Sequence, residues 1–370
     1  MYNTRMKRII STLLVIIFVL SAVSCSRTAD NSATSESAAT DVTTLASITE
    51  LTAEPTESTT ETTKDNKGHF KFNPKVCSPI MTEIMGEKMR DAWFSLIDAV
   101  YAGETTFECA DDDTYNWMMG QFPHLCLPVI EDLITACDDR NHPVKNGVAE
   151  FKYNLPPEEV RQKIDEFGEM VEGILNDNLR DDYDDVEKAL ALYEYFHKTC
   201  EYDYDAADEL TRHDVDYLTA MRVFNEHKGI CCELATAYSF LLTEAGVDAT
   251  TMSGNRSYDS AGHEWSYVRT GGKCYHIDPT YAICYKDSLK LAYFMMDDDK
   301  REEEDSYDRS SFYMTCCYAT EFDRPCYPAD DKKYEYLWDK TFVSADHESR
   351  KMVCTGINED GYETESEVEY

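Results

Sequence analysis

Basic residues are scarce in this 370-residue chain. It has 35 Lys and Arg against 72 Asp and Glu, which gives a formal net charge of −37 at pH 7. Proteins that bind nucleic acids or anionic lipid surfaces need positive charge to attract phosphate groups. We therefore expect no nucleic-acid partner, and the acidic composition favours solubility and basic partners.

Recognisable metal-binding patterns and internal repeats are also lacking. None of the cysteines lies in a Cys-x-x-Cys pair with the spacing of a zinc site. The acidic runs 297–299 and 302–305 lack the spaced ligands and the glycine of a calcium loop. We interpret these runs as solvated surface, and we expect neither a metal nor a cofactor.

The apolar run at the N-terminus, from Ile9 to Val23, is shorter than the roughly 20 residues that a bilayer span needs. Basic residues precede it and Ser24 follows it, which is typical of a secretory signal. The segment Ala22-Val23-Ser24-Cys25 resembles a bacterial lipoprotein processing site, with Ala22 at the position that is usually Leu. We predict a signal peptide over 1–24, lipid attachment at Cys25 and a location on the extracytoplasmic face of the cell membrane; an uncleaved membrane anchor is the alternative.

The remaining chain divides by composition. Residues 25–68 are rich in Ser, Thr, Ala and Glu and show no periodicity, so we expect a disordered stalk that holds the rest away from the membrane. The expected parts beyond the stalk are a helical N-terminal region (69–183), a catalytic core (184–285), an extension of that core (286–357) and a frayed acidic tail (358–370). Helical spacing predicts helices over Met85–Tyr101, Pro128–Cys137 and Pro156–Asn176, and the segment Ser306–Tyr318 is expected to add a strand or helix near the core.

A helix is predicted from Cys231 to Ala245, because apolar residues recur there at spacings of three and four. Gly229 precedes it and Gly246 follows it as a natural stop. Cys231 would then lie at the helix N-terminus, where the helix dipole stabilises a thiolate and unpaired N–H groups can face an oxyanion. A small buried hydrophobe is the alternative for Cys231, and we interpret the adjacent Cys232 as a structural residue that points away.

Two alternating segments, 263–269 and 273–278, are joined by Gly271-Gly272, a turn that predicts a β-hairpin. This register places Trp265 opposite Asp278, so that His263 lies diagonal to Asp278, roughly 7–8 Å away at the backbone. We expect the carboxylate to orient the imidazole and to support its protonated form.

Three short blocks together resemble the transglutaminase-like superfamily of papain-type cysteine enzymes. They are Gly229-Ile230-Cys231 with Ala235 after it, His263-Glu264-Trp265, and Tyr275 to Thr280. Upstream, the segment Ala189–Thr199 followed by Tyr202-Asp203 and Tyr204-Asp205 resembles the helix and Tyr-Asp element of that family. The resemblance covers roughly residues 184–285 and implies an α+β fold in which a nucleophile helix packs on an antiparallel sheet; Glu264 and Ser266 depart from the small and amide residues usual beside the tryptophan.

The resemblance implies that Cys231 is the nucleophile, His263 the general base and then acid, and Asp278 the orienting carboxylate. The thiolate would attack a peptide or protein amide and form a thioester. Water as acceptor gives hydrolysis or deamidation, and a lysine-type amine gives a cross-link. Tyr202 or Tyr204 could supply a second oxyanion donor, although packing is the commoner role of such a tyrosine. The alternative function is a non-catalytic surface binding or adhesion module that retains the fold.

The remaining cysteines leave the redox state open. Of 14 cysteines, Cys25 and Cys231 are assigned above. In an oxidising exterior, Cys316-Cys317 or the pair Cys274 and Cys284 are candidates for disulfides. Mostly reduced thiols in an anaerobic habitat are equally consistent with the sequence.

Overall fold

The computed structural model describes residues 67–137, 143–212, 218–258, 261–317, 327–346, 349–358 and 361–370. The predicted signal peptide, the lipidation site at Cys25 and nearly all of the stalk lie outside these residues. The described chain combines helices with mainly antiparallel sheets, so the expected α+β class is confirmed. None of the helices within these ranges is long and apolar enough to cross a membrane.

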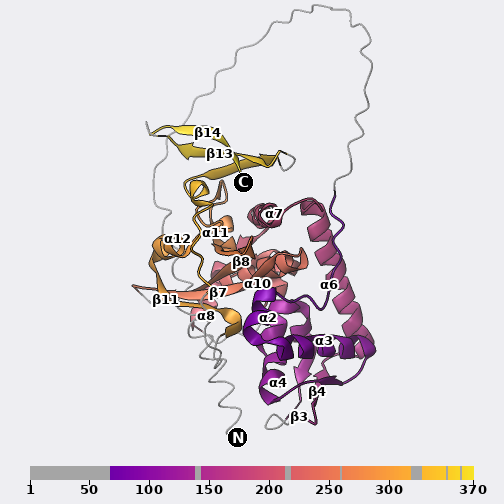
Figure 1. Cartoon of the computed structure of the whole chain (residues 1–370). Coiled ribbons are helices and arrows are strands. Elements are labelled where there is room, and N and C mark those ends of the chain that lie inside the picture. Colours follow the sequence, from indigo (N-terminus) through magenta and orange to yellow (C-terminus); the bar gives the residue numbers. More distant parts are fainter. Residues whose placement is uncertain are drawn as a thin grey trace, which may run out of the picture.

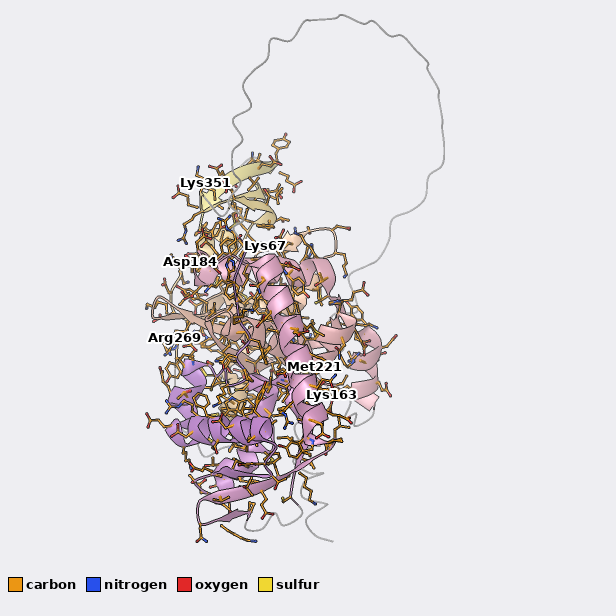
Figure 2. All side chains as sticks on the ribbon, turned by 90° about the vertical axis from the view of Figure 1, so that its right-hand side faces the viewer. Lys67, Lys163, Asp184, Met221, Arg269 and Lys351 are labelled. Carbon is orange, nitrogen blue, oxygen red and sulfur yellow. The ribbon has the colours of Figure 1, made fainter. Side chains whose placement is uncertain are left out.

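The N-terminal region combines helices with a small antiparallel sheet (Figure 1). Its helices are α2 (Pro79–Met85), α3 (Glu87–Ala102), α4 (Asp112–Met118), α5 (Gln121–Cys126) and α6 (Pro157–Asn178). Its strands are β1 (Thr106–Glu108), β2 (Ile134–Ala136), β3 (Val144–Lys145) and β4 (Val148–Tyr153). The helices predicted over Met85–Tyr101 and Pro156–Asn176 are confirmed with small shifts of their ends. In Figure 2, α6 faces the viewer, with Lys163 in its N-terminal half and Lys67 beside its C-terminal end.

The helix predicted over Pro128–Cys137 is wrong. The chain makes a short 3₁₀ helix over Pro128–Asp132 and then enters β2, whose Ile134 pairs with Tyr153 of β4. The apolar residues of this segment are buried as the helical spacing suggested. However, pairing with β4 satisfies the backbone beyond Leu133, and a sequence pattern cannot reveal such a distant partner.

The core is a four-stranded antiparallel sheet with the helix α10 (Cys231–Glu244) packed on it (Figure 1). The sheet order is β11-β7-β8-β9, formed by β11 (Tyr307–Met314), β7 (Asp248–Arg256), β8 (Gly262–Thr270) and β9 (Lys273–Ile277). Nearly every residue of α10 is buried. Around it lie α7 (Asp185–Thr199), α8 (Tyr204–Arg212), α9 (Met221–Glu226), α11 (Pro279–Cys284) and the two-stranded pair β5 (Glu201–Tyr202) and β6 (Lys228–Gly229).

The β8–β9 hairpin has the predicted register. Thr270 pairs with Lys273 and Val268 with Tyr275 across the turn. Gly271 and Gly272 have φ angles of 58° and 75°, in the left-handed region that glycine adopts without strain. The C-terminal stop predicted for the nucleophile helix is also present, since Gly246 follows α10 with a φ of 86°.

The extension contributes to two sheets. Its strand β11 joins the core sheet, as expected for Ser306–Tyr318, and its helix α12 (Asp298–Glu303) lies near β9 and β11. A second antiparallel sheet has the order β10-β12-β13-β14 and lies at the top of Figure 1. It consists of β10 (Leu289–Lys290), β12 (Thr341–Asp346), β13 (Lys351–Ile357) and β14 (Glu363–Glu369).

The acidic tail is not frayed, contrary to our expectation. Residues Glu363–Glu369 form β14 and pair with the whole of β13. The Lys351 ammonium lies 2.5 Å from the Glu367 carboxylate, and Arg350 forms an ion pair with Asp184 at the start of α7. Figure 2 shows Lys351 above Asp184. These basic residues on β13 and its preceding turn offset part of the repulsion within the tail.

Cys274 and Cys284, which we considered as a disulfide pair, are both free thiols in this structure. Cys316 is also a reduced thiol, and the side chain of Cys317 lies outside the described residues. Cys231 itself is reduced.

Candidate functional site

The site begins where β6 leads into α10. Gly229 lies in β6, Ile230 has an extended backbone conformation, and Cys231 is the first residue of the helix. The Ile230 N–H donates to the Glu233 carboxylate at 2.9 Å, which helps to fix the first turn. Cys231 therefore lies at the helix N-terminus as predicted, where the N–H groups of the first turn have no acceptor within the helix.

His263 and Asp278 meet across the hairpin. His263 Nε2 lies 2.7 Å from Asp278 Oδ2, because the two residues lie at adjacent ends of neighbouring strands. Ser266 pairs with Ile277, so continuing the ladder places Asp278 opposite Trp265 and diagonal to His263. Asp278 also accepts from the Thr280 N–H and caps α11. The diagonal contact expected from the sequence is thus present in the structure.

His263 also interacts with Cys231. The Cys231 thiol hydrogen-bonds to the Cys232 thiol and to the His263 imidazole. The pKa of Cys231 lies well below its ordinary value, chiefly because of the Cys232 thiol and, against the opposing effect of burial, because of His263. Burial disfavours a charged imidazole, but the Asp278 carboxylate outweighs it and raises the pKa of His263 to about 10. These two shifts favour a thiolate–imidazolium pair at neutral pH.

We expected the side chain of Cys232 to point away from Cys231, and this expectation is wrong. Its thiol contacts Cys231, and the pKa of Cys232 is raised well above its ordinary value, first by this hydrogen bond and then by burial. The prediction assumed ideal helical directions, but side chains in the first turn of a helix are less restricted by a preceding turn.

Aromatic rings surround the imidazole. The ring of His263 lies 5.9 Å from those of Trp265 and Tyr281 and 5.8 Å from that of Tyr307. Cys231 is 2% exposed and His263 is 7% exposed. A site of this kind excludes most water and strengthens the electrostatic interactions within it.

Tyr202 and Tyr204 occupy packing positions. Their rings contact each other edge to face with centroids 4.9 Å apart. Tyr202 also packs against the apolar cluster that contains Ile230 and Ala206. These contacts fit the packing role rather than that of an oxyanion donor.

Three residues near the site were missed by sequence reasoning. Arg301 Nη1 donates to Asp278 Oδ2 at 3.1 Å, and His276 lies 2.9 Å from Asp298. Arg301 and Asp298 both belong to α12. The interpretation of the run 297–299 as solvated surface is therefore wrong in part, because Asp297 is 1% exposed and Asp298 contacts a buried histidine. The basic pair Lys300-Arg301 inside an acidic run was the available signal.

A buried acid, Glu264, lies close to Cys231. Burial raises the pKa of Glu264 to about 7, and its Oε1 atom has no hydrogen-bond partner. The Glu264 backbone N–H contacts the Cys231 sulfur. Nearby, His124 bonds to Thr236 at 3.0 Å and to Glu131 at 3.0 Å.

A cavity of about 190 Å³ is bordered by Glu131, the partner of His124. It is in the N-terminal region, and its walls include Met118, Ile130 and Glu131 but none of the three predicted site residues. Across the described part of the chain, no group of three or more His, Cys, Asp or Glu residues is arranged to hold a metal ion.

Comparison with known proteins agrees with this geometry. Residues 174–279 match the family model described as the transglutaminase-like superfamily, a range that contains Cys231, His263 and Asp278. No curated protein sequence matches the chain. Two solved structures resemble it, each at 19% identity: a TGase, with a TM-score of 0.26 and 34% of each chain covered, and a "putative cysteine protease" from Cytophaga hutchinsonii, with a TM-score of 0.21, 26% of this chain covered and 32% of that one. The aligned parts span about a third of those chains. The family match shows that this protein contains a transglutaminase-like core over residues 174–279, within its α+β architecture.

Proposed function

We propose that this protein is a membrane-anchored, extracytoplasmic cysteine enzyme that acts on peptide or protein amide bonds. The contact of His263 with Cys231 on one side and with Asp278 on the other carries the proposal. Thiol, imidazole and carboxylate in this arrangement are the groups that a cysteine nucleophile requires.

The reaction follows from the charges of the resting site. The Cys231 sulfur attacks the carbonyl carbon of an amide, and the backbone N–H groups at the start of α10 face the oxyanion that forms. The C–N bond then breaks as His263 gives its proton to the departing amine or ammonia, and a thioester remains on Cys231.

The second half of the reaction restores the enzyme. Neutral His263 takes a proton from the acceptor, whose oxygen or nitrogen attacks the thioester carbon. The C–S bond breaks and the Cys231 thiolate returns beside the imidazolium. We infer water as the main acceptor, because water is the default acceptor outside a cell; a lysine-type amine would give a cross-link instead.

Alkylation of the purified full-length protein tests this proposal. Iodoacetamide near pH 6, followed by peptide mapping, is expected to modify Cys231 at least about 10-fold faster than the partly exposed Cys137. The variant His263→Ala is expected to lose this advantage, and Cys231→Ser serves as the blank. Ammonia release from glutamine-containing peptides, and amine incorporation into them, then distinguish hydrolysis from cross-linking.

The low exposure of Cys231 and His263 supports one alternative, a non-catalytic binding or adhesion module that retains the fold. Slow alkylation of Cys231, no faster than that of Cys137, would favour this alternative. So would an unreactive Cys231 together with saturable binding of a peptide.

The anchoring at Cys25 is a separate part of the proposal. The motif that precedes Cys25 supports it. Cys25→Ala is expected to move the protein from the membrane fraction to the soluble fraction in cells fed a labelled fatty acid, with loss of the label. Equal labelling of wild type and Cys25→Ala would overturn it.

A further inference from the structure

We propose that Arg301 is a positioning residue that holds Asp278 in the ionised, His263-directed arrangement throughout the catalytic cycle. This inference rests on the proposed function. Arg301 lies in α12, outside residues 174–279 that match the transglutaminase-like model. The extension would then supply part of the support of the site.

Arg301 and Asp278 form a completely buried pair. Arg301 Nη1 lies 3.1 Å from Asp278 Oδ2, and both side chains are 0% exposed. The same carboxylate oxygen lies 2.7 Å from His263 Nε2. Asp278 Oδ2 therefore has both His263 and Arg301 as partners, and rotation about the side-chain bonds of Asp278 would break both contacts.

The same three elements, β8, β9 and α12, make a second set of contacts beside the first. Asp298 of α12 lies 2.9 Å from Nε2 of His276 in β9, and Trp265 Nε1 of β8 donates to Nδ1 of His276 at 2.8 Å. His276 and Asp278 are two residues apart at the end of β9, as are Trp265 and His263 in β8. Asp298 and Arg301 are three apart on α12, so they lie on one face of that helix.

The spacing of Asp298 and Arg301 on α12 matches the spacing of His276 and Asp278 at the end of β9. Residues three apart on a helix and two apart on a strand are both separated by roughly 5–7 Å. One face of α12 can therefore contact both His276 and Asp278 at the end of β9. We infer that the packing of α12 against β9 fixes the orientations of His276, Asp278 and the side chains that they contact.

The charge of Arg301 matters because the charge of His263 changes. A buried carboxylate without a partner is strongly destabilised. His263 loses its proton when the amine departs, and Asp278 would then be uncompensated if the histidine were its only partner. Arg301 stays charged at every step. The pKa of Asp278 remains low despite burial because both His263 and Arg301 favour its charged form.

The remaining surroundings of Arg301 hold it in place. Its guanidinium carbon lies 4.5 Å from the centre of the Trp265 ring and 4.2 Å from that of the Tyr307 ring. The Nε and Nη2 atoms have no hydrogen-bond partner. Stacking between two aromatic rings stabilises a cation whose N–H groups are unpaired. The titratable groups that face this guanidinium are Asp278, His276 and Tyr307.

The test compares three variants of the full chain. Arg301→Met keeps the length of the side chain and removes its charge. Arg301→Lys keeps the charge and removes the planar fork. Arg309→Met is the matched control, because Arg309 also pairs with two residues of α12, Asp299 and Glu302, but is 41% exposed, and exposed ion pairs contribute little to stability. Each protein is checked for folding by circular dichroism. The pH profile of Cys231 alkylation, kcat and KM are then measured.

Arg301→Met is expected to lower kcat about 100-fold, less than the roughly 10⁴-fold typical of losing the orienting carboxylate itself, with KM within about threefold. The alkaline transition of the alkylation profile is expected to move upward, because His263 alone then compensates Asp278 and holds its proton more tightly. Arg301→Lys is expected to keep that transition and lower kcat about 10-fold. Arg309→Met is expected to match wild type.

The outcomes separate this inference from the proposed function. If wild-type Cys231 is not activated, the proposed function fails. If wild type is active and folded Arg301→Met has the same profile and kcat, Arg301 has no positioning role. If Arg301→Met does not fold, Arg301→Lys decides: an unchanged kcat overturns the inference, and a lower kcat with an unmoved transition supports it.

Discussion

At the scale of single residues, the sulfur of Cys232 lies beside the sulfur of Cys231. The Cys232 thiol is the first cause of the low pKa of Cys231, with His263 acting in the same direction against burial, and the pKa of Cys232 is raised well above its ordinary value. Cys232 therefore keeps its proton and acts as the hydrogen-bond donor. If Cys231 is the nucleophile that we propose, Cys232 therefore tunes its reactivity.

Removing this donor should weaken the nucleophile. In Cys232→Ala, the apparent pKa of Cys231 is expected to rise and its alkylation near pH 6 to slow severalfold, because one partner of the thiolate is lost. Cys232→Ser retains an O–H donor and is expected to keep most of the reactivity. The pH dependence of alkylation, followed by mass spectrometry, measures both. Wild-type behaviour in both variants would mean that Cys232 only packs.

The contacts of the site differ in how far they could be predicted. His263 and Asp278 are 15 residues apart, and a two-glycine turn between them determines which side chains meet. Arg301 follows Asp278 by 23 residues, through a segment without regular periodicity. Nothing in its local sequence specifies which strand it approaches, so only the folded chain reveals that contact.

At the scale of elements, the β8–β9 turn shows how one local conformation positions the site. Gly272 has a φ of 75°, and a Cβ added there would meet nothing within 4 Å. Gly173 in α6 also has open space around it, but its backbone is helical. The two glycines therefore differ in backbone conformation alone.

Alanine at these two positions should have opposite effects. Gly272→Ala is expected to reduce the free energy of unfolding by about 1 kcal/mol, because a left-handed backbone is strained for alanine. Gly173→Ala is expected to raise it by roughly 0.5–1 kcal/mol, because alanine favours a helix more than glycine does. Urea titration of both variants measures the difference. A stabilising Gly272→Ala would contradict the left-handed turn.

The strand β14 shows where element prediction failed. Four glutamates at alternate positions, from Glu363 to Glu369, carry like charge and suggest a solvated tail. They form a strand because β13 offers a complete set of backbone partners and because Lys351 and Arg350 bring positive charge. Both conditions depend on residues earlier in the chain, so the composition of the tail alone was misleading.

At the scale of the whole molecule, a chain of net charge −37 still buries carboxyl groups. Glu244 is 8% exposed and Glu264 is 1% exposed, on α10 and on the strand beneath it. Burial raises the pKa of Glu244 to about 8 and that of Glu264 to about 7. Each has a carboxylate oxygen without a hydrogen-bond partner, so the neutral form is the one that the interior favours.

Stability should therefore fall as the pH rises from 5 to 8. Between the ordinary value of 4.5 and the raised values near 7 and 8, the folded chain holds these protons and the unfolded chain does not. Because the folded state binds more protons there, the free energy of unfolding decreases by roughly 1 kcal/mol per pH unit for each group, and the decrease ends above its folded pKa.

Glutamine variants isolate this contribution. Glu244→Gln and Glu264→Gln cannot ionise, so each is expected to flatten the decline of the unfolding free energy in urea titrations at pH 5, 6, 7 and 8. Glu159→Gln, at an exposed position of α6, is the control and is expected to follow wild type. Glu264→Gln should flatten the curve only up to about pH 7, and Glu244→Gln up to about pH 8, because each effect ends at the folded pKa of the group removed. Slopes identical to wild type in both variants would show that these carboxyl groups are already ionised in the folded protein.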